Sequence, residues 1–208
     1  MVQRKQLHPP YRVFSDFLPN DLAWELLEYA KANKDDFQPA TTHDGYDPTV
    51  RVSRKIYLSK KLQQKLKERI LPQTACFIET LGVSAFEPDD IELELVAHGD
   101  GAFYSRHIDT FTGANFERQR LLSAVCYLHK MPKIFSGGAL RLYSLGKADT
   151  IADFVDIEPT HNTLVVFPSW APHSVERVSS PSEEFMDSRF AINAWLWRKK
   201  PDPLNQQV

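Results

Sequence analysis

The chain has 208 residues, of which 42% are hydrophobic and 25% charged, with a formal net charge of −2. This length allows one domain with a substantial core, and the balanced charge argues against a nucleic-acid-binding protein. The start, MVQRKQLHPP, lacks the apolar region of a signal peptide, and no apolar run reaches membrane-spanning length. Cys76 and Cys126 form no CxxC pattern, which favours reduced thiols. We therefore expect a cytoplasmic protein without a membrane partner.

The first part of the chain predicts a short strand and then a helix. Residues 11–17 form the strand, and the helix follows over residues 18–33, with Asn20 or Asp21 as its expected N-cap. The apolar residues at helical spacing are Leu22, Leu26, Leu27 and Ala30.

Residues 59–82 predict a second helical region. Ser59 is its expected N-cap, and Gly82 marks its C-terminal end. Pro72 lies inside the region and predicts a kink or a break there, because proline cannot donate the helical hydrogen bond.

From about residue 91 the hydrophobic period changes to that of strands. Residues 91–98, IELELVAH, alternate strictly, as a half-buried strand does. Two helical regions followed by many strands predict an α+β domain whose second half is a sandwich or jelly roll, with the helices against one sheet. We divide it into helical support (about 1–90), a jelly-roll core (91–198) and a tail (199–208). The remaining short β-type runs are residues 121–129, 139–143, 154–158, 163–168, 173–178 and 189–197.

The candidate site is a His-x-Asp pair, His107 and Asp109. In an extended segment both side chains point to the same face. The pattern alone is weak, since 7 His and 27 Asp+Glu in this chain give about one such pair by chance. A surface strand with alternating polar residues is the alternative interpretation. A second pair, His98 and Asp100, is flanked by glycines and indicates a turn.

His173 is the best-placed third member, because it follows an apolar strand and a turn bracketed by prolines. Two histidines and one carboxylate form the facial set that holds non-haem Fe(II) and leaves open positions for reactants. The other histidines fit less well, being in polar loop contexts or beside a lysine: His8, His43, His129 and His161.

From about residue 91 to 197 the chain resembles the prolyl 4-hydroxylase-like branch of the Fe(II)/2-oxoglutarate-dependent oxygenases. Each matching segment is degenerate, but their common order is specific, while the first 90 residues resemble the family's helical support only loosely. The segments are GDGAFYSRHID, LLSAVCYLH, SGGALRLY, FVDIEPTHNTLVVFPSWAPHSVERV and SRFAINAWLW.

The resemblance implies that His107, Asp109 and His173 bind Fe(II), and that Arg189 and Tyr127 bind the distal carboxylate of 2-oxoglutarate. A guanidinium can meet a carboxylate with two hydrogen bonds and stays charged when buried. Arg189 follows His173 by more residues than in many relatives, because the segment SSPSEEFMD lies between them. We interpret this segment as an enlarged hairpin loop, and Arg177 is the competing anchor.

Other residues receive weaker interpretations. Tyr104, His98 and Arg120 are candidates for the substrate side or the pocket edge, although a solvated charge is the alternative for Arg120. Gly137 and Gly138 are interpreted as turn geometry alone, and Trp195 and Phe167 as core. Residues 37–58 are rich in turn formers and carry Arg51 and Arg54, so they form either a flap over the iron or an irregular connection.

The resemblance further implies hydroxylation of a C–H bond, with Fe(II), 2-oxoglutarate and O2 consumed to give succinate and CO2, and with ascorbate as a candidate reductant. Related halogenases replace the carboxylate ligand with a small residue, so Asp109 favours hydroxylation. A prolyl or other residue of a protein or peptide is the preferred substrate. Open alternatives are a free amino acid or small metabolite, a metal-binding sensor module without oxidation, and zinc-dependent hydrolysis.

Overall fold

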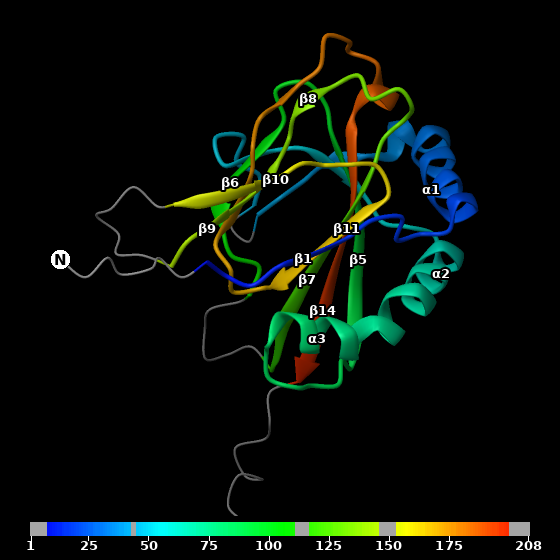
Figure 1. Ribbon diagram of the computed structural model, residues 1–208. Helices are drawn as coiled ribbons and strands as arrows, with labels where there is room; N and C mark the ends of the chain where they lie inside the picture. The colour runs from blue at the N-terminus through cyan, green and yellow to red at the C-terminus, as the bar shows by residue number, and fades with distance from the viewer. Residues whose placement is uncertain (1–7, 43–44, 111–116, 146–152, 200–208) are drawn as a thin grey trace, which may run out of the picture.

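The structure is a computed structural model that describes residues 8–42, 45–110, 117–145 and 153–199. His43, residues 1–7 and most of the predicted C-terminal tail lie outside these residues. The described strands form two main antiparallel sheets (Figure 1). The larger sheet has the order β1 (Arg12–Phe14), β11 (Thr163–Pro168), β7 (Arg118–Leu128), β14 (Arg189–Lys199), β5 (Asp90–His98), β4 (Arg54–Ile56), β2 (Gln38–Pro39).

The smaller sheet faces the larger one and carries part of the candidate site. Its order is β10 (Phe154–Ile157), β9 (Leu140–Tyr143), β12 (His173–Val175), β6 (Phe103–His107), β3 (Arg51–Val52). A separate pair joins β13 (Val178–Ser179) to β8 (Ser136–Gly137).

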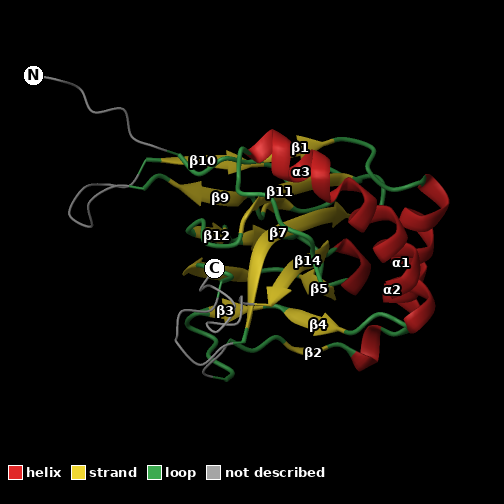
Figure 2. Cartoon of the chain, turned by 90° about the horizontal axis from the view of Figure 1, so that it is seen from below, coloured by secondary structure: helices red, strands yellow, loops and turns green. Residues whose placement is uncertain are grey.

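Three α-helices lie on one side of the strands: α1 (Asn20–Ala32), α2 (Lys60–Ile70) and α3 (Thr74–Leu81) (Figure 2). Short 3-10 turns cover Lys34–Asp36, Leu71–Gln73 and Phe185–Asp187. Among the described helices, none is both long and apolar enough to cross a membrane. The predicted α+β jelly roll with helices against one sheet is confirmed.

The helix ends test the local sequence signals. Ser59 caps α2 by accepting a hydrogen bond from the Leu62 backbone, and Gly82 ends α3 with a φ of 63°. The prediction for α1 is wrong, because Pro19 is the N-cap and no side chain caps the helix. The carbonyl of Pro19 accepts a hydrogen bond from the Ala23 amide, and the proline ring holds φ at −53°.

Alternation along the central strands creates two apolar layers. On β7 and β11, Cys126 and Val166 belong to the core shared with the helices, whereas Tyr127, Val165 and Phe167 belong to the core between the sheets. Successive side chains of a strand point to opposite faces, so each central strand contributes to both layers. The helices therefore close one face of the larger sheet, and the smaller sheet closes part of the other.

β5 departs from the half-buried strand predicted for its alternating residues. Leu93 and Leu95 pack in the helix-side core, as the pattern requires. The other face is also shielded from water, since Glu94 is 4% and His98 3% exposed. Polar residues alternate here because this face lines a cavity between the sheets.

The first 90 residues are more than helical support. β1 pairs with β11, β3 pairs with β6, and β4 pairs with β5, so this region contributes strands to both sheets. The segment 37–58, expected to be either a flap or an irregular connection, contains the strands β2, β3 and β4, and Arg51 and Lys55 on two of them line the cavity; residues 43–44 are not described.

The chain between His173 and Arg189 also differs from expectation. The predicted strand 173–178 is interrupted, because β12 ends at Val175 and β13 begins at Val178 with a different partner strand. The following segment, interpreted from the sequence as an enlarged hairpin loop, packs against the protein: the ring of Phe185 lies 5.0 Å from that of Phe37 and 5.4 Å from that of Phe190.

Candidate functional site

The predicted metal-binding residues converge at one end of the smaller sheet. His107 ends β6, and His173 begins β12 directly opposite it. Asp109 follows two residues after β6, where its backbone amide donates to the Ser169 carbonyl at 2.8 Å. One ligand atom from each of the three side chains lies within 4.8 Å of the others. The sequence pair and its distant partner therefore meet in space.

Backbone carbonyls orient both imidazoles. Nδ1 of His107 lies 2.8 Å from the Ser105 carbonyl, and Nδ1 of His173 lies 2.9 Å from the Ala171 carbonyl. A carbonyl only accepts, so each Nδ1 carries the proton and each Nε2 is left as a donor of electrons to a metal. The Nε2 atoms lie 3.7 and 3.6 Å from the carboxylate oxygens of Asp109. This spacing leaves room for an ion bonded at about 2 Å to each atom.

Asp109 is held by a hydrogen-bond chain. Ser123 donates to its Oδ2 at 2.7 Å, and the hydroxyl of Ser169 lies 2.9 Å from that of Ser123. Burial by itself would raise the pKa of Asp109, but His173, His107 and the hydrogen bonds from Ser123 and Trp195 outweigh it and lower the pKa. The carboxylate is therefore ionised and fixed, as a metal ligand requires.

Burial lowers the pKa of His107 to about 3, with the neighbouring His173 as the next cause. The imidazole is thus neutral and ready to bind a cation at neutral pH. Tyr104 stacks on this ring with 3.5 Å between the centroids, and the guanidinium carbon of Arg51 lies 4.7 Å from the Tyr104 centroid.

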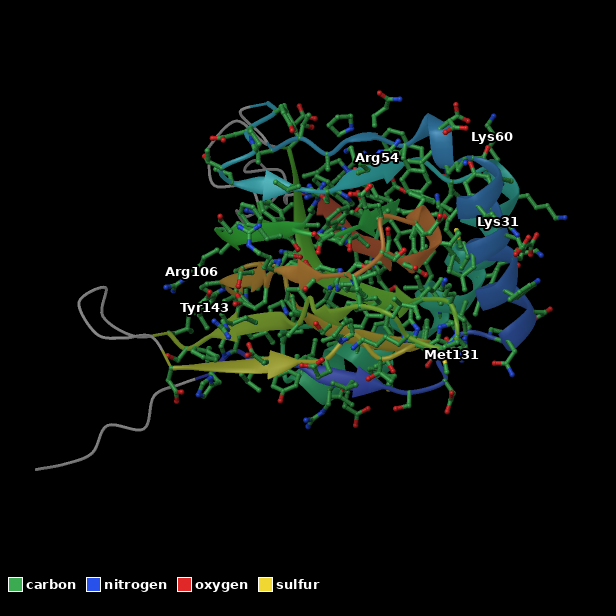
Figure 3. All side chains as sticks on the ribbon, turned by 90° about the horizontal axis from the view of Figure 1, so that it is seen from above. Lys31, Arg54, Lys60, Arg106, Met131 and Tyr143 are labelled. Carbon is green, nitrogen blue, oxygen red and sulfur yellow. The ribbon has the colours of Figure 1, made fainter. Side chains whose placement is uncertain are left out.

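By contrast, Arg106 points outward and lies over the ring of Tyr143 at 4.5 Å (Figure 3). It sits beside His107 in the sequence and is exposed. The alternation of β6 thus directs His107 inward and its neighbour to the surface.

A cavity of about 680 Å³ lies beside the three converging groups. His98, Tyr104 and Arg120, the sequence candidates for the substrate side or pocket edge, all line it. Its wall on the larger sheet follows the alternation of β14, with Arg189, Asn193 and Trp195 at every second or fourth position. Trp195, which the sequence assigned to the core, is buried as expected and also lines the cavity.

Arg189 and Tyr127 form an unusual buried pair. Arg189 is 1% exposed and lines the cavity, and its guanidinium carbon lies 4.8 Å from the Tyr127 ring centroid. Within the described part of the chain, Nε of Arg189 and the hydroxyl of Tyr127 have no hydrogen-bond partner, and no carboxylate forms an ion pair with Arg189. Such groups are costly to bury without a partner. A carboxylate entering the cavity would satisfy them.

The competing anchor, Arg177, lies elsewhere. Its Nη1 donates to the Gly101 carbonyl at 2.6 Å, and its guanidinium lies over the ring of Phe103. It does not line the cavity.

Gly138 does more than form a turn, which corrects the sequence interpretation. A Cβ atom at this position would lie 2.7 Å from Cδ of Arg189 and 2.9 Å from Cγ2 of Val178. Its φ of 70° also disfavours other residues. The missing side chain therefore leaves space for the Arg189 side chain. A Cβ atom on Gly137 would likewise collide with the carbonyl oxygen of Arg177.

The remaining polar wall of the cavity consists of ion pairs that sequence reasoning missed. Lys55 pairs with Glu94 at 2.5 Å, and Arg120 pairs with Glu92 at 2.6 Å. The guanidinium of Arg120 also lies 4.0 Å from the Trp195 ring centroid. The alternating glutamates of IELELVAH were the available signal, but alternation does not distinguish a solvent-facing strand from one that faces a cavity.

Comparison with known proteins agrees with this geometry. A family model described as 2OG-Fe(II) oxygenase superfamily matches residues 93–197. An uncharacterised PKHD-type hydroxylase of Synechocystis sp. is 39% identical over 142 residues, which are 66% of this chain and 46% of that protein. The chain thus matches less than half of the relative's length.

Two solved structures share the fold. A prolyl-4-hydroxylase of Pseudomonas putida superposes with a TM-score of 0.69 at 24% identity, covering 92% of this chain and 94% of that one. A prolyl hydroxylase of Trichoplax adhaerens, solved with a peptide fragment of the hypoxia inducible factor oxygen degradation domain, gives 0.67 at 18% identity, covering 90% and 83%. The family match spans about half of the chain and contains most of the cavity wall, and so the chain belongs to the 2OG-Fe(II) oxygenase superfamily.

Proposed function

We propose that the protein is an Fe(II)- and 2-oxoglutarate-dependent dioxygenase that hydroxylates a C–H bond. The observation that carries this proposal is the presence, in one cavity, of the His107, Asp109 and His173 set and of the Arg189 guanidinium, which has no carboxylate partner among the described residues. The first set would hold Fe(II), and Arg189 with Tyr127 would hold the distal carboxylate of 2-oxoglutarate. When bound, these groups supply the oxidation of a C–H bond by O2, with release of succinate and CO2.

The protein's own residues orient and shield this chemistry. Ser123 holds the Asp109 carboxylate in place, while backbone carbonyls fix the tautomers of the two histidines. Tyr104 covers one face of His107 and limits the access of water to it. The wall with Arg51, Arg120 and Trp195 is available for the substrate.

We favour a prolyl or other residue of a protein or peptide as the substrate, and a cytoplasmic location. The support for the substrate class is the fold shared with proteins named prolyl hydroxylases, one of them solved with a peptide. The location is proposed from the two free cysteines, Cys76 and Cys126. A free amino acid or small metabolite is the second candidate. Arg51 supports it, because this cavity-lining cation is 8% exposed and forms no carboxylate ion pair within the described residues.

The test is succinate release in the presence of Fe(II), 2-oxoglutarate and ascorbate, combined with a mass-spectrometric screen of peptides and amino acids for a gain of one oxygen. We expect His107→Ala and Asp109→Ala to abolish succinate release, and His8→Gln, an exposed histidine, to retain it. A normal rate of 2-oxoglutarate turnover in Asp109→Ala would refute the proposal. Oxidised peptides and oxidised amino acids identify the first and second substrate class, respectively.

A further inference from the structure

Arg189 is confined on two sides, by His98 and by Gly138. On the neighbouring strand, His98 lies directly opposite Arg189, and its Nδ1 is 3.2 Å from Nη1 of the guanidinium. On another side, Gly138 approaches so closely that a Cβ atom there would lie 3.3 Å from Nε. The arginine therefore has little freedom to rotate.

The direction of the His98 hydrogen bond follows from its partner. A guanidinium can only donate, so Nδ1 of His98 accepts, and its ring proton resides on Nε2. His98 is 3% exposed, and burial, followed by the charges of Arg189 and Arg51, lowers its pKa well below the usual value. The imidazole is thus a neutral acceptor at neutral pH.

This hydrogen bond fixes the plane of the guanidinium. An arginine side chain has several rotatable bonds, and ordering them costs free energy that a preset hydrogen bond removes from the binding step. The ring of Tyr127 lies beside the guanidinium that His98 holds in place. The hydroxyl of this tyrosine has no hydrogen-bond partner among the described residues. Carboxylate recognition depends on this plane, because bidentate hydrogen bonds require coplanar groups.

We infer that His98 is a positioning residue for the oxo-acid co-substrate: its Nδ1 holds Arg189 in the orientation that receives a distal carboxylate, in the space left by Gly138. This inference rests on the proposed function. It assigns to His98 a role in selecting dicarboxylic over monocarboxylic 2-oxo acids.

The test measures binding, not turnover. Isothermal titration of the full chain loaded with Mn(II) compares 2-oxoglutarate with 2-oxopentanoate, which has the same chain length but no distal carboxylate. His98→Leu removes the acceptor, and His98→Asn returns an acceptor oxygen close to the position of Nδ1. We expect His98→Leu to weaken 2-oxoglutarate binding by about tenfold to a hundredfold and 2-oxopentanoate binding by less than about twofold. His98→Asn should recover most of the lost affinity.

Gly138→Ala provides a second approach that leaves His98 intact. Its added methyl group must displace the Arg189 side chain, so it should weaken the binding of 2-oxoglutarate selectively, and it replaces His98→Leu as the test if that variant does not fold. Equal losses for both oxo acids, or unchanged discrimination in His98→Leu, would overturn the role of His98. If the wild-type protein does not prefer 2-oxoglutarate, the proposed function itself fails at Arg189, and the inference fails with it.

Discussion

Two arginines of the same region, Arg177 and Arg189, show how surroundings determine the role of a residue. Arg177 donates to a backbone carbonyl outside the cavity, whereas Arg189 lies in the cavity wall with no carboxylate partner among the described residues. A buried cation of this kind binds an anion more strongly than an exposed one, because water competes less.

Replacing Arg189 should therefore affect the co-substrate selectively. We expect Arg189→Gln to raise the dissociation constant of 2-oxoglutarate by about a hundredfold or more, since charged hydrogen bonds are lost. Calorimetric titration of the Mn(II)-loaded protein measures this. Arg177→Gln is the matched control and should change the constant by less than about twofold. Similar losses in the two variants would contradict the assignment of Arg189.

His98 should also make stability depend on pH. Its pKa is lowered in the folded protein, by burial first, so below pH 6.5 the unfolded chain takes up a proton that the folded chain resists. The free energy of unfolding should therefore fall as the pH decreases from 6.5 and gain nothing from this group above it. Each proton contributes about 1.4 kcal/mol per pH unit at most. In urea unfolding between pH 4.5 and 7, the free energy of unfolding of His98→Asn should depend less steeply on pH than that of the wild type. An equally steep dependence would show that His98 is not the cause.

At the scale of elements, the order of the helices and most strands could be predicted from sequence, because hydrophobic period and turn residues are local signals. β11 matches its predicted range of 163–168, and Pro72 separates α2 from α3 as expected. The unpredicted features are tertiary. Glu94 and Trp195 look like a surface residue and a core residue until the opposing sheet defines a cavity, and Gly138 looks like a turn until Arg189 is placed against it.

The site itself was partly visible in the sequence. His107 and Asp109 share a face through a local period, and the structure brings His173 to them through strand pairing across 66 residues of chain (173 − 107). Arg51 and Lys55 carried no usable signal, because their approach to the cavity depends on which strands β3 and β4 join.

The segment that precedes β14 should contribute to stability. Phe185 packs between Phe37 and Phe190, so Phe185→Ala is expected to lower the free energy of unfolding by about 1–3 kcal/mol through lost contacts. Glu183→Ala, an exposed position of the same segment, should change it by less than about 0.5 kcal/mol. Urea unfolding of both variants makes the comparison. If Phe185→Ala and Glu183→Ala had the same free energy of unfolding, the segment before β14 would contribute little to stability.

At the scale of the whole molecule, ligand binding should stabilise the fold. The three proposed metal ligands come from β6, β12 and the chain after β6, and Arg189 lies on the opposing sheet. Mn(II) together with 2-oxoglutarate would therefore connect the two sheets. At a hundredfold excess over the dissociation constant the gain is about 2.7 kcal/mol.

For a protein of this size we expect an increase in Tm of about 5 °C or more with both ligands present. Differential scanning calorimetry measures the shift. Asp109→Ala should lose it, after its fold has been checked by circular dichroism without ligands. A shift of equal size in Asp109→Ala would show that the stabilisation arises at another site.

The passage of the chain from one sheet to the other at Ser53 has a mechanical consequence. β3 ends at Val52 in the smaller sheet and β4 begins at Arg54 in the larger sheet, so a single residue joins them. Ser53 is further tied by its carbonyl to the Ala40 amide and by its hydroxyl to Arg51. At this rim the single linking residue prevents the two sheets from moving apart by a hinge motion. We therefore expect the width of the cavity at this rim to change little, so that a ligand would enter by rotation of lining side chains such as Lys55 and Tyr57.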